Sequence, residues 1–296
     1  MRTGRLATVM VVLAATVLPV RGEEPSALGV VSFYNPHLMY LKYQPLVDYL
    51  TEQTGRPWVL RIARSYEDAV GDVCSGRATV AYLGPVTYLR AHELCGAAPL
   101  VQLRTRGEAT YHSVVLVRQD SPVASLAELK GKRFGFGAPL STSSHLMPRK
   151  MLLDAGLVLG RDVECRYFWH HERAAKAVLM GEVDACGVRD LTGEKFLQRG
   201  LRLLAQSPPI PNFPLVVGPA VAPAVREELV RALVELPAQD PALRTRVAGW
   251  DEELAGGFAV VTPAAFASIG DLAAQVFGPL WVKVPEQQLQ CGPGGP

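Results

Sequence analysis

The stretch Lys130-Gly-Lys-Arg-Phe-Gly-Phe-Gly-Ala-Pro-Leu-Ser-Thr-Ser-Ser-His-Leu-Met-Pro-Arg149 decides the fold. A short apolar strand at 133–136 passes through a turn containing Gly137 into four consecutive hydroxyl residues and then into a helix. Glycine lets the backbone bend sharply after the strand. Because a proline inside a helix removes a hydrogen bond, Pro148 predicts that regular helix begins at Met147 or Pro148, with 141–146 forming a wound turn ahead of it.

The four hydroxyl residues of this stretch, Ser141, Thr142, Ser143 and Ser144, can hold an oxyanion. The first amides of a helix have no intrahelical acceptors, the helix dipole is positive there, and hydroxyl groups rotate toward a common point. A simpler interpretation of the same residues is a helix cap without a ligand. Other features of the chain are needed to choose between the two.

Outward from this stretch the chain alternates strand-like and helix-like segments, which predicts mainly parallel sheets covered by helices on both faces. Ser65 is expected to cap a helix that begins at Tyr66. A Pro-rich segment at 207–214 is expected to be a stiff crossing, and 223–276 to be helices that pack back on the first lobe. The expected strands are 28–33, 58–63, 79–83, 100–104, 112–118, 133–136, 163–168 and 185–188, and the expected helices are 38–54, 66–75, 86–93, 126–129, 147–155 and 173–180.

Together these segments predict an α/β protein of two lobes with a ligand cleft between them. The loop 137–144 follows a strand, and ligands in open α/β sheets bind beyond the carboxyl ends of strands. The expected division of the chain is a signal peptide at 1–22, the first part of lobe 1 at 23–117, lobe 2 at 118–210, the returning part of lobe 1 at 211–290 and a disordered tail at 291–296.

The N-terminus predicts export. Arg2 and Arg5 precede an apolar run from Leu6 to Val20, and a small-residue cleavage site follows near Gly22. An uncleaved membrane anchor is the alternative, although the run is shorter than a membrane span of roughly 20 residues. Removal of 1–22 takes three arginines away, which shifts the formal net charge from +2 to −1. A nearly neutral exported chain without a basic stripe gives no basis for nucleic-acid binding.

Five cysteines in an exported chain allow two disulfides and one odd thiol. We expect Cys74 to pair with Cys95 and Cys165 with Cys186, since each pair is 21 residues apart and lies in or beside predicted strands. The spacings leave open that these are buried free thiols. They contain no metal-ligand pattern, and no cofactor is expected.

The order and spacing of several short motifs resemble the phosphate/phosphite/phosphonate-binding proteins of ABC transporters, a branch of the type II periplasmic binding proteins. The resemblance covers nearly the whole chain after residue 22. The matching motifs are Tyr43-Gln-Pro-Leu-Val-Asp-Tyr-Leu50, Thr54-Gly55, Gly84-Pro85-Val-Thr-Tyr88, Tyr111-His-Ser113, Asp120-Ser121, Leu129-Lys-Gly-Lys132, Ser141-Thr-Ser143 with Pro148-Arg149, His171-Glu172 and Gly181-Glu-Val-Asp184.

The resemblance implies a ligand site made from both lobes. It assigns the phosphonate oxygens to Ser141, Thr142 and Ser143, and two facing phenol donors to Tyr66 and Tyr111. It also implicates His171, followed by the acid Glu172. Ser144 stands where glycine is commoner in the family, which makes the loop slightly less permissive, and Arg149 is expected either behind the site or in solvent.

A second departure from the family concerns ligand choice. Members that hold an aminoalkylphosphonate use acidic groups for the ammonium, and one of these positions falls here on Asn212 or Phe213. Asp190 is the one acid near the other position. Because an unpaired buried ammonium is costly, the resemblance favours phosphite, phosphate, methylphosphonate or a similar tetrahedral oxyanion.

The leading hypothesis is therefore a monomeric solute receptor that delivers a small oxyanion to a membrane permease. The alternative is a sensory receptor of the same fold that presents its ligand to a membrane histidine kinase. The ligand would be, for example, a phosphorus oxyanion, or arsenite bound by a cleft thiol. An enzyme with Cys165, His171 and Glu172 as nucleophile, base and orienting acid is disfavoured, because Cys165 and His171 lie along one strand and its exit.

Overall fold

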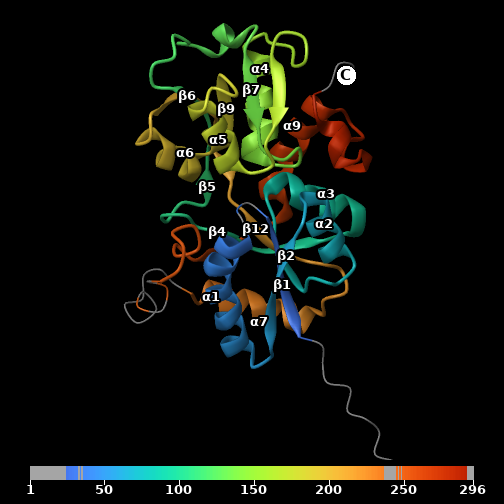
Figure 1. Ribbon diagram of the computed structural model, residues 1–296. Coiled ribbons are helices and arrows are strands. Elements are labelled where there is room, and N and C mark those ends of the chain that lie inside the picture. The colour runs from blue at the N-terminus through green and yellow to red at the C-terminus, as the bar shows by residue number, and fades with distance from the viewer. Residues whose placement is uncertain are drawn as a thin grey trace, which may run out of the picture.

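The structure, a computed structural model, describes residues 25–32, 34, 36–236, 245, 247 and 249–291. It consists of two lobes, each a mixed β-sheet flanked by helices, which lie one above the other in Figure 1. The α/β class expected from the alternating segments is confirmed. The expected signal peptide at 1–22 lies outside the described residues, and no helix within them is long and apolar enough to span a bilayer.

The first lobe contains a sheet of six strands in the order β13-β4-β12-β3-β1-β2. The neighbours β2 and β3 run parallel to β1, whereas β12 is antiparallel to both β3 and β4. Ser65 caps α2 as expected, since its Oγ accepts a hydrogen bond from Asp68 N at 3.0 Å. The strands are β1 (Ser26–Val31), β2 (Trp58–Ala63), β3 (Val80–Tyr82), β4 (Ala98–Leu103), β12 (Pro214–Val217) and β13 (Phe258–Val260), with helices α1 (Pro36–Thr54), α2 (Tyr66–Cys74), α3 (Pro85–Cys95) and α7 (Pro223–Val234).

The second lobe contains five strands in the order β10-β6-β9-β7-β8. Here β7 runs parallel to β8 and β9, so their carboxyl ends meet at one edge of the sheet. Those ends lead into the loop 137–144, the start of α5 and the start of α6 respectively. The elements are β6 (Ser113–Arg118), η1 (Leu126–Leu129), β7 (Arg133–Phe136), η2 (Thr142–Leu146), α4 (Met147–Asp154), β8 (Glu164–Tyr167), α5 (His171–Leu179), β9 (Ala185–Arg189), α6 (Asp190–Leu197) and β10 (Leu201–Gln206).

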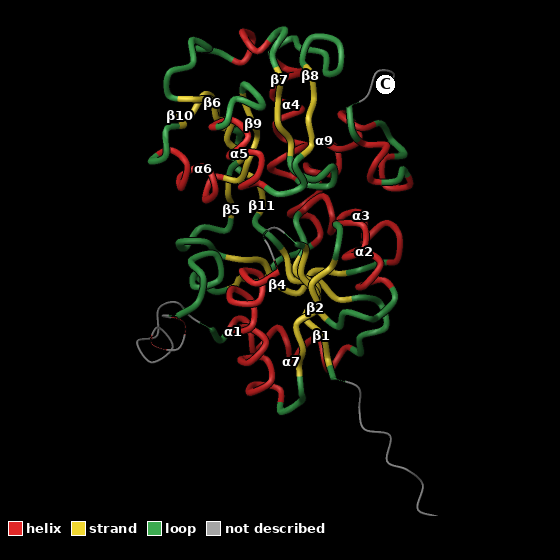
Figure 2. Tube along the Cα trace, in the orientation of Figure 1, coloured by secondary structure: helices red, strands yellow, loops and turns green. Residues whose placement is uncertain are grey.

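Two crossings join the lobes, and they pair with each other as β5 (Thr110–Tyr111) and β11 (Ile210–Pro211) between the two sheets (Figure 2). The first crossing ends at Ser113, ahead of the boundary expected after 117, because β6 pairs with β9 and β10 of the second sheet. The segment 207–214 is not wholly irregular as expected. Pro214 is the first residue of β12, a place where a proline is tolerated because a strand can begin there.

The C-terminal elements contact both lobes. They are η3 (Pro263–Phe266), α9 (Ala267–Phe277), η4 (Trp281–Lys283) and η5 (Glu286–Leu289), drawn in orange-red to red in Figure 1. Helix α9 packs against α3 of the first lobe and against α4 of the second. The expectation that the chain after residue 223 packs on the first lobe therefore holds for α7 but is incomplete for α9.

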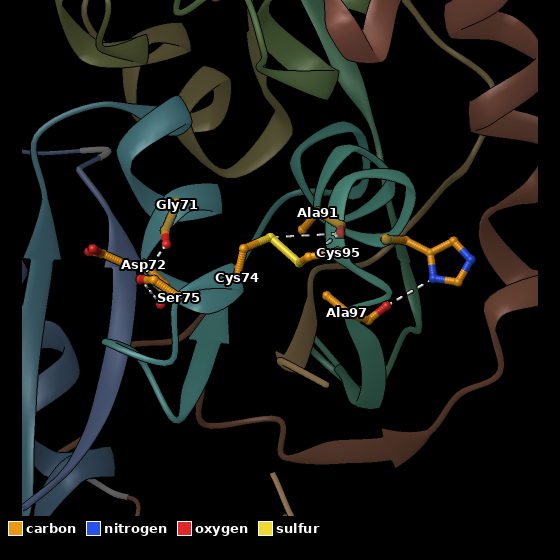
Figure 3. Close-up of a disulfide and its surroundings, with 8 residues drawn as sticks. Gly71, Asp72, Cys74, Ser75, Ala91, Cys95 and Ala97 are labelled. Carbon is orange, nitrogen blue, oxygen red and sulfur yellow. Dashed lines mark hydrogen bonds between the residues drawn. A yellow bond between two sulfur atoms is a disulfide. The ribbon is translucent and has the colours of Figure 1, made fainter. Parts of the chain in front are cut away.

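One of the two expected disulfides is correct. Cys74 and Cys95 join the last residues of α2 and α3 (Figure 3). The pairing of Cys165 with Cys186 is wrong, because β8 and β9 lie on opposite sides of β7 and two strand spacings exceed the reach of a disulfide. Cys165 instead pairs with Cys291, and Cys186 is a buried free thiol. The bridge also removes Cys291 from the tail expected to be disordered, while 292–296 lie outside the described residues.

Candidate functional site

The hydroxyl run adopts the wound turn that Pro148 predicts. Residues 142–146 form a single π-helical turn, η2, and α4 begins at Met147. Ser141 precedes the turn with extended backbone, and its Oγ accepts a hydrogen bond from Ser144 N at 3.1 Å. The prediction of regular helix from Met147 is therefore confirmed.

A hydrogen-bonded chain connects Ser141 to β9 and fixes the direction of its proton. Arg189 N donates to His171 Nδ1 at 3.1 Å, so a neutral His171 carries its proton on Nε2, which lies 3.2 Å from Ser141 Oγ. Burial and the nearby Arg189 charge lower the pKa of His171 to about 3 and keep the ring neutral. Ser141 Oγ thus accepts from Ser144 N and from His171, and its own O–H remains to be donated.

The hydroxyl of Ser144 makes its hydrogen bonds to the backbone around the loop. Its Oγ accepts from Gly137 N at 2.8 Å and donates to Gly187 O at 2.5 Å. A Cβ at Gly137 would lie 2.6 Å from Ser144 Oγ, so the close approach of these two segments requires glycine at 137. Ser144 is expected as a ligand residue because it belongs to the run of four hydroxyls, but its hydrogen bonds are made within the second lobe.

Tyr66 and Tyr111 face the hydroxyl run from the other side of the cleft, and both are buried. Burial raises the pKa of Tyr66, with the neighbouring Ser141 hydroxyl opposing the shift. Burial also raises the pKa of Tyr111, and Arg189, Ser143 and Thr142 oppose it. Among the described residues neither Tyr111 Oη nor Ser143 Oγ meets hydrogen-bond geometry with a partner, although both are fully enclosed. The two enclosed hydroxyls lie near each other without a well-oriented hydrogen bond, so both can turn toward a common acceptor.

The start of α3 also meets the hydroxyl run. Val86 N donates to Thr142 Oγ1 at 3.0 Å, which joins the first lobe to the second. Because α2 begins at Tyr66, α3 at Pro85 and η2 at Thr142, three helix N-termini converge on this region. Their dipoles all favour negative charge.

A small cavity of about 20 Å³ adjoins this region and is lined by residues of both lobes: Tyr34, His171, Arg189, Thr192, Phe213 and Glu253. Arg189 and Glu253 form an ion pair at its wall. Glu253 Oε1 also accepts from Tyr82 Oη at 2.5 Å, and Tyr43 Oη lies 3.5 Å from Oε2. The cavity therefore has one charged wall in which both charges are already paired.

Sequence reasoning missed Tyr34, Thr192, Arg189 and Glu253. A weak signal existed for Arg189, the charged residue that ends the apolar strand 185–189 beside the anion loop. Glu253 lies in the acidic run 251–253 between α7 and β13, and no local pattern connects that run to the cleft.

Of the three residues considered for recognition of an amine, Asn212, Phe213 and Asp190, only Phe213 lines the cavity. Asn212 is fully buried, and its side chain accepts from Phe213 N and Arg189 and donates to Thr105 Oγ1 at 3.0 Å. Phe213 lines the cavity. Asp190 accepts from His112 N and Leu191 N and does not line the cavity.

Two neighbours of the predicted site have structural roles. Arg149 is buried behind η2 and donates to Leu289 O at 3.0 Å, which confirms a position behind the site rather than in solvent. His145 Nδ1 lies 2.6 Å from Pro139 O, and its Nε2 lies 2.9 Å from Tyr167 Oη. In the described part of the chain no cluster of three or more His, Cys, Asp or Glu side chains has the geometry of a metal site.

The cysteines contradict two details of the alternatives drawn from the sequence, arsenite capture by a thiol and the set of enzyme residues that includes Cys165. All four cysteines in disulfides lack a thiol, and Cys186 is buried in the second-lobe core beside Val114 and Val188. Arsenite capture by a cleft thiol is therefore contradicted. Cys165 cannot act as a nucleophile while it is bridged to Cys291, which contradicts the proposed catalytic set.

Comparison with protein families supports the resemblance seen in the motifs. A family model described as "ABC transporter, phosphonate, periplasmic substrate-binding protein" matches residues 28–256. The chain is 24% identical over 225 residues to the phosphonates-binding periplasmic protein of Escherichia coli K12, covering 71% of this chain and 66% of that protein. It is 29% identical over 174 residues to the phosphate-import protein PhnD of Mycolicibacterium smegmatis, covering 55% and 54%. The alignments thus span just under two thirds and about half of the relatives' lengths.

Solved structures share the two-lobed fold. PhnD1 of Prochlorococcus marinus in complex with methylphosphonate superposes with a TM-score of 0.77 at 17% identity, covering 86% of this chain and 98% of that one. A binding-protein component of an ABC phosphonate transporter from Pseudomonas aeruginosa gives a TM-score of 0.75 at 19% identity, covering 90% and 88%. At these identities the likeness establishes the fold.

Proposed function

Because the chain belongs to the family of phosphonate periplasmic substrate-binding proteins of ABC transporters, we propose that it captures a small tetrahedral phosphorus oxyanion in the periplasm and delivers it to a membrane permease. The binding site is the contact region between the hydroxyl run and the two tyrosines. Ser141, Thr142 and Ser143 bind the oxyanion from the second lobe, Tyr66 and Tyr111 from the first.

The single observation that supports this proposal most is the pair of enclosed donors, Tyr111 Oη and Ser143 Oγ, from opposite lobes. An oxyanion between them would accept both hydrogen bonds and would also accept the O–H of Ser141. His171 acts through Ser141, since it donates to the Ser141 oxygen and so directs the serine proton outward. Ser144 holds the loop in shape and does not contact the ligand.

The donors of this site are neutral, which suits a protein that must release its cargo. A hydrogen bond to a charged group contributes about 1.5–3 kcal/mol. Five such bonds contribute about 7.5–15 kcal/mol, which ranges from roughly the 8 kcal/mol of micromolar binding to well above it before ordering costs are subtracted. Closure of the lobes brings the tyrosines to the anion and removes it from water, so the same contacts bind and enclose it.

The test is isothermal titration calorimetry of the protein without residues 1–22 against methylphosphonate, phosphite and phosphate. The double variant Ser141→Ala with Thr142→Ala should lose at least about 100-fold in affinity, because two charge-assisted hydrogen bonds disappear. Ser125→Ala, an exposed hydroxyl outside the cleft, is the matched control and should bind like the unaltered protein. Full affinity in the double variant would remove the site, and binding of none of the three anions by the unaltered protein would remove the proposed function.

A further inference from the structure

Arg189 reaches from one lobe into the other. It is the last residue of β9 in the second lobe, yet its guanidinium bonds to first-lobe residues. Its Nη1 pairs with Glu253, and its Nη2 lies 3.2 Å from Asn212 Oδ1 and 3.4 Å from Thr105 Oγ1. The side chain therefore belongs to the closed form, in which it lies beside both crossings.

The guanidinium is also held in place by aromatic rings. Its carbon lies 4.8 Å from the centre of the Tyr111 ring and 4.7 Å from that of Phe213. Arg189 is 6% exposed and lines the cavity. Its Nε has no hydrogen-bond partner within the described residues, and Asp190 Oδ1 lies 3.8 Å from it. A fixed cation with an unused donor thus faces the space next to the proposed oxyanion site.

We propose that Arg189 is a specificity-determining residue that rejects ligands with a cationic substituent, so that the bound molecule is a tetrahedral oxyanion whose substituent is neutral or absent. This inference rests on the proposed function, because it concerns which oxyanion the same cleft accepts.

The charges at the cavity wall explain the rejection. Glu253 is the carboxylate in the cavity lining, and its charge is already neutralised by Arg189. An ammonium group brought into the cavity loses its water and gains no counter-charge in return, because Glu253 is already paired with Arg189. A methyl group of the same size loses no comparable hydration and packs against the rings of Tyr34 and Phe213.

Two probes of equal length separate charge from size: 2-aminoethylphosphonate, which ends in an ammonium, and n-propylphosphonate, which ends in a methyl group. Their dissociation constants are measured by competition against bound methylphosphonate at pH 7. The unaltered protein should bind n-propylphosphonate at least tenfold more tightly. Equal binding, or a preference for the amine, would overturn the inference.

Three variants test whether Arg189 and Glu253 are responsible for the preference between the two probes. Arg189→Met exposes the Glu253 carboxylate to the cavity and should shift the ratio of the two constants at least tenfold toward the amine. Adding Glu253→Gln to that variant should abolish the shift, since the ammonium then has no counter-ion. Arg189→Lys keeps a cation and should keep the original preference. Thermal melting curves confirm that each variant is folded.

The outcomes keep this inference separate from the proposed function. If methylphosphonate, phosphite and phosphate all fail to bind, the proposed function fails and the inference with it. If one of them binds and Arg189→Met keeps the original ratio, the inference alone fails. If methylphosphonate binds but neither longer probe binds the unaltered protein, the Arg189→Met variant still decides, because it must gain the amine in preference to the methyl probe.

Discussion

The two ends of the cleft differ in the charge of the groups that line them. At the hydroxyl end, defined by Ser141, Thr142, Ser143, Tyr66 and Tyr111, every group is a neutral donor, and two of them have no partner within the described protein. At the ion-pair end, defined by Arg189, Glu253, Tyr34 and Thr192, the full charges are already paired with each other.

The difference indicates how binding and selection are divided. Neutral dipoles can bind an anion tightly enough to capture it and still let it leave, whereas a committed ion pair adds little attraction for a ligand and acts through shape and repulsion. Both ends combine residues of the two lobes, so both depend on closure. Each prediction below tests one side of this division.

The largest effect is expected when the phenol donors are removed from the hydroxyl end. The double variant Tyr66→Phe with Tyr111→Phe deletes two charge-assisted hydrogen bonds and should weaken oxyanion binding at least about 100-fold, mainly through faster dissociation. Stopped-flow displacement measures the rate. Tyr88→Phe is the matched control, because its hydroxyl, like that of Tyr111, is buried without a partner among the described residues but lies in α3 against Phe266. A double variant that dissociates no faster than this control would refute the closing role of the tyrosines.

The second-largest effect is expected at Ser144, whose substitution should change stability rather than oxyanion affinity. Ser144→Ala removes the hydroxyl's two hydrogen bonds, to Gly137 N and Gly187 O, although Gly137 N keeps the Ser144 carbonyl oxygen at 3.1 Å, and should lower the free energy of unfolding by about 2 kcal/mol. Oxyanion affinity should change less than threefold, because the hydroxyl is used inside the loop. Urea denaturation and calorimetry on the same samples measure the two quantities. A large loss of affinity without a loss of stability would place Ser144 at the ligand instead.

The hydroxyl end was predictable because its signal is local. Four adjacent hydroxyls, a glycine turn and Pro148 specify the wound turn from sequence, and the family resemblance is what points to the two tyrosines. The ion-pair end was not predictable in this way. Arg189 and Glu253 are 64 residues apart and come from different lobes, so their contact exists only after both sheets have formed and the cleft has closed.

The wrong prediction of a Cys165–Cys186 disulfide has the same cause, since the contact depends on the assembled fold and not on local sequence. Equal spacing of 21 residues suggested Cys165 and Cys186 as a pair, but the position of β7 between their strands is a property of sheet order, which spacing along the chain does not reveal. The partner that does bond, Cys291, is 126 residues away in the C-terminal segment.

A third prediction concerns the pH dependence of the loop behind the hydroxyl end. Burial and the Arg149 charge lower the pKa of His145 to about 3, below the unfolded value near 6.5. The folded state therefore binds fewer protons, and the stabilisation is complete above pH 6.5 and lost as pH falls toward 3. Between pH 7 and 5.5, protonation of His145 in the unfolded state should therefore lower the free energy of unfolding by about 1 kcal/mol. Chemical denaturation at pH 7 and at pH 5.5 gives the free energy of unfolding at each pH. In His145→Asn, which keeps a donor for Pro139 O, the difference between these two values should be smaller than in the unaltered protein. An equal difference in the two proteins would contradict the prediction.

The smallest effect is expected at the C-terminal segment, which fastens the lobes near the hydroxyl end. Cys291 joins this segment to β8 of the second lobe, while α9 packs on α3 of the first. The bridge should therefore limit how far the ligand-free lobes separate. Cys165→Ser with Cys291→Ser should enlarge the ligand-free radius of gyration in X-ray scattering and weaken oxyanion binding a few-fold, since closure then orders a freer chain.

The matched control for that variant is Cys74→Ser with Cys95→Ser, which removes a bridge of similar chemistry within the first lobe. It should lower thermal stability and leave the difference between ligand-free and ligand-bound scattering unchanged. If both cysteine pairs changed the scattering alike, the effect would come from general loosening. If neither did, the contacts of the ion-pair end with Thr105 and Asn212, beside the two crossings, would be sufficient to set the opening of the cleft.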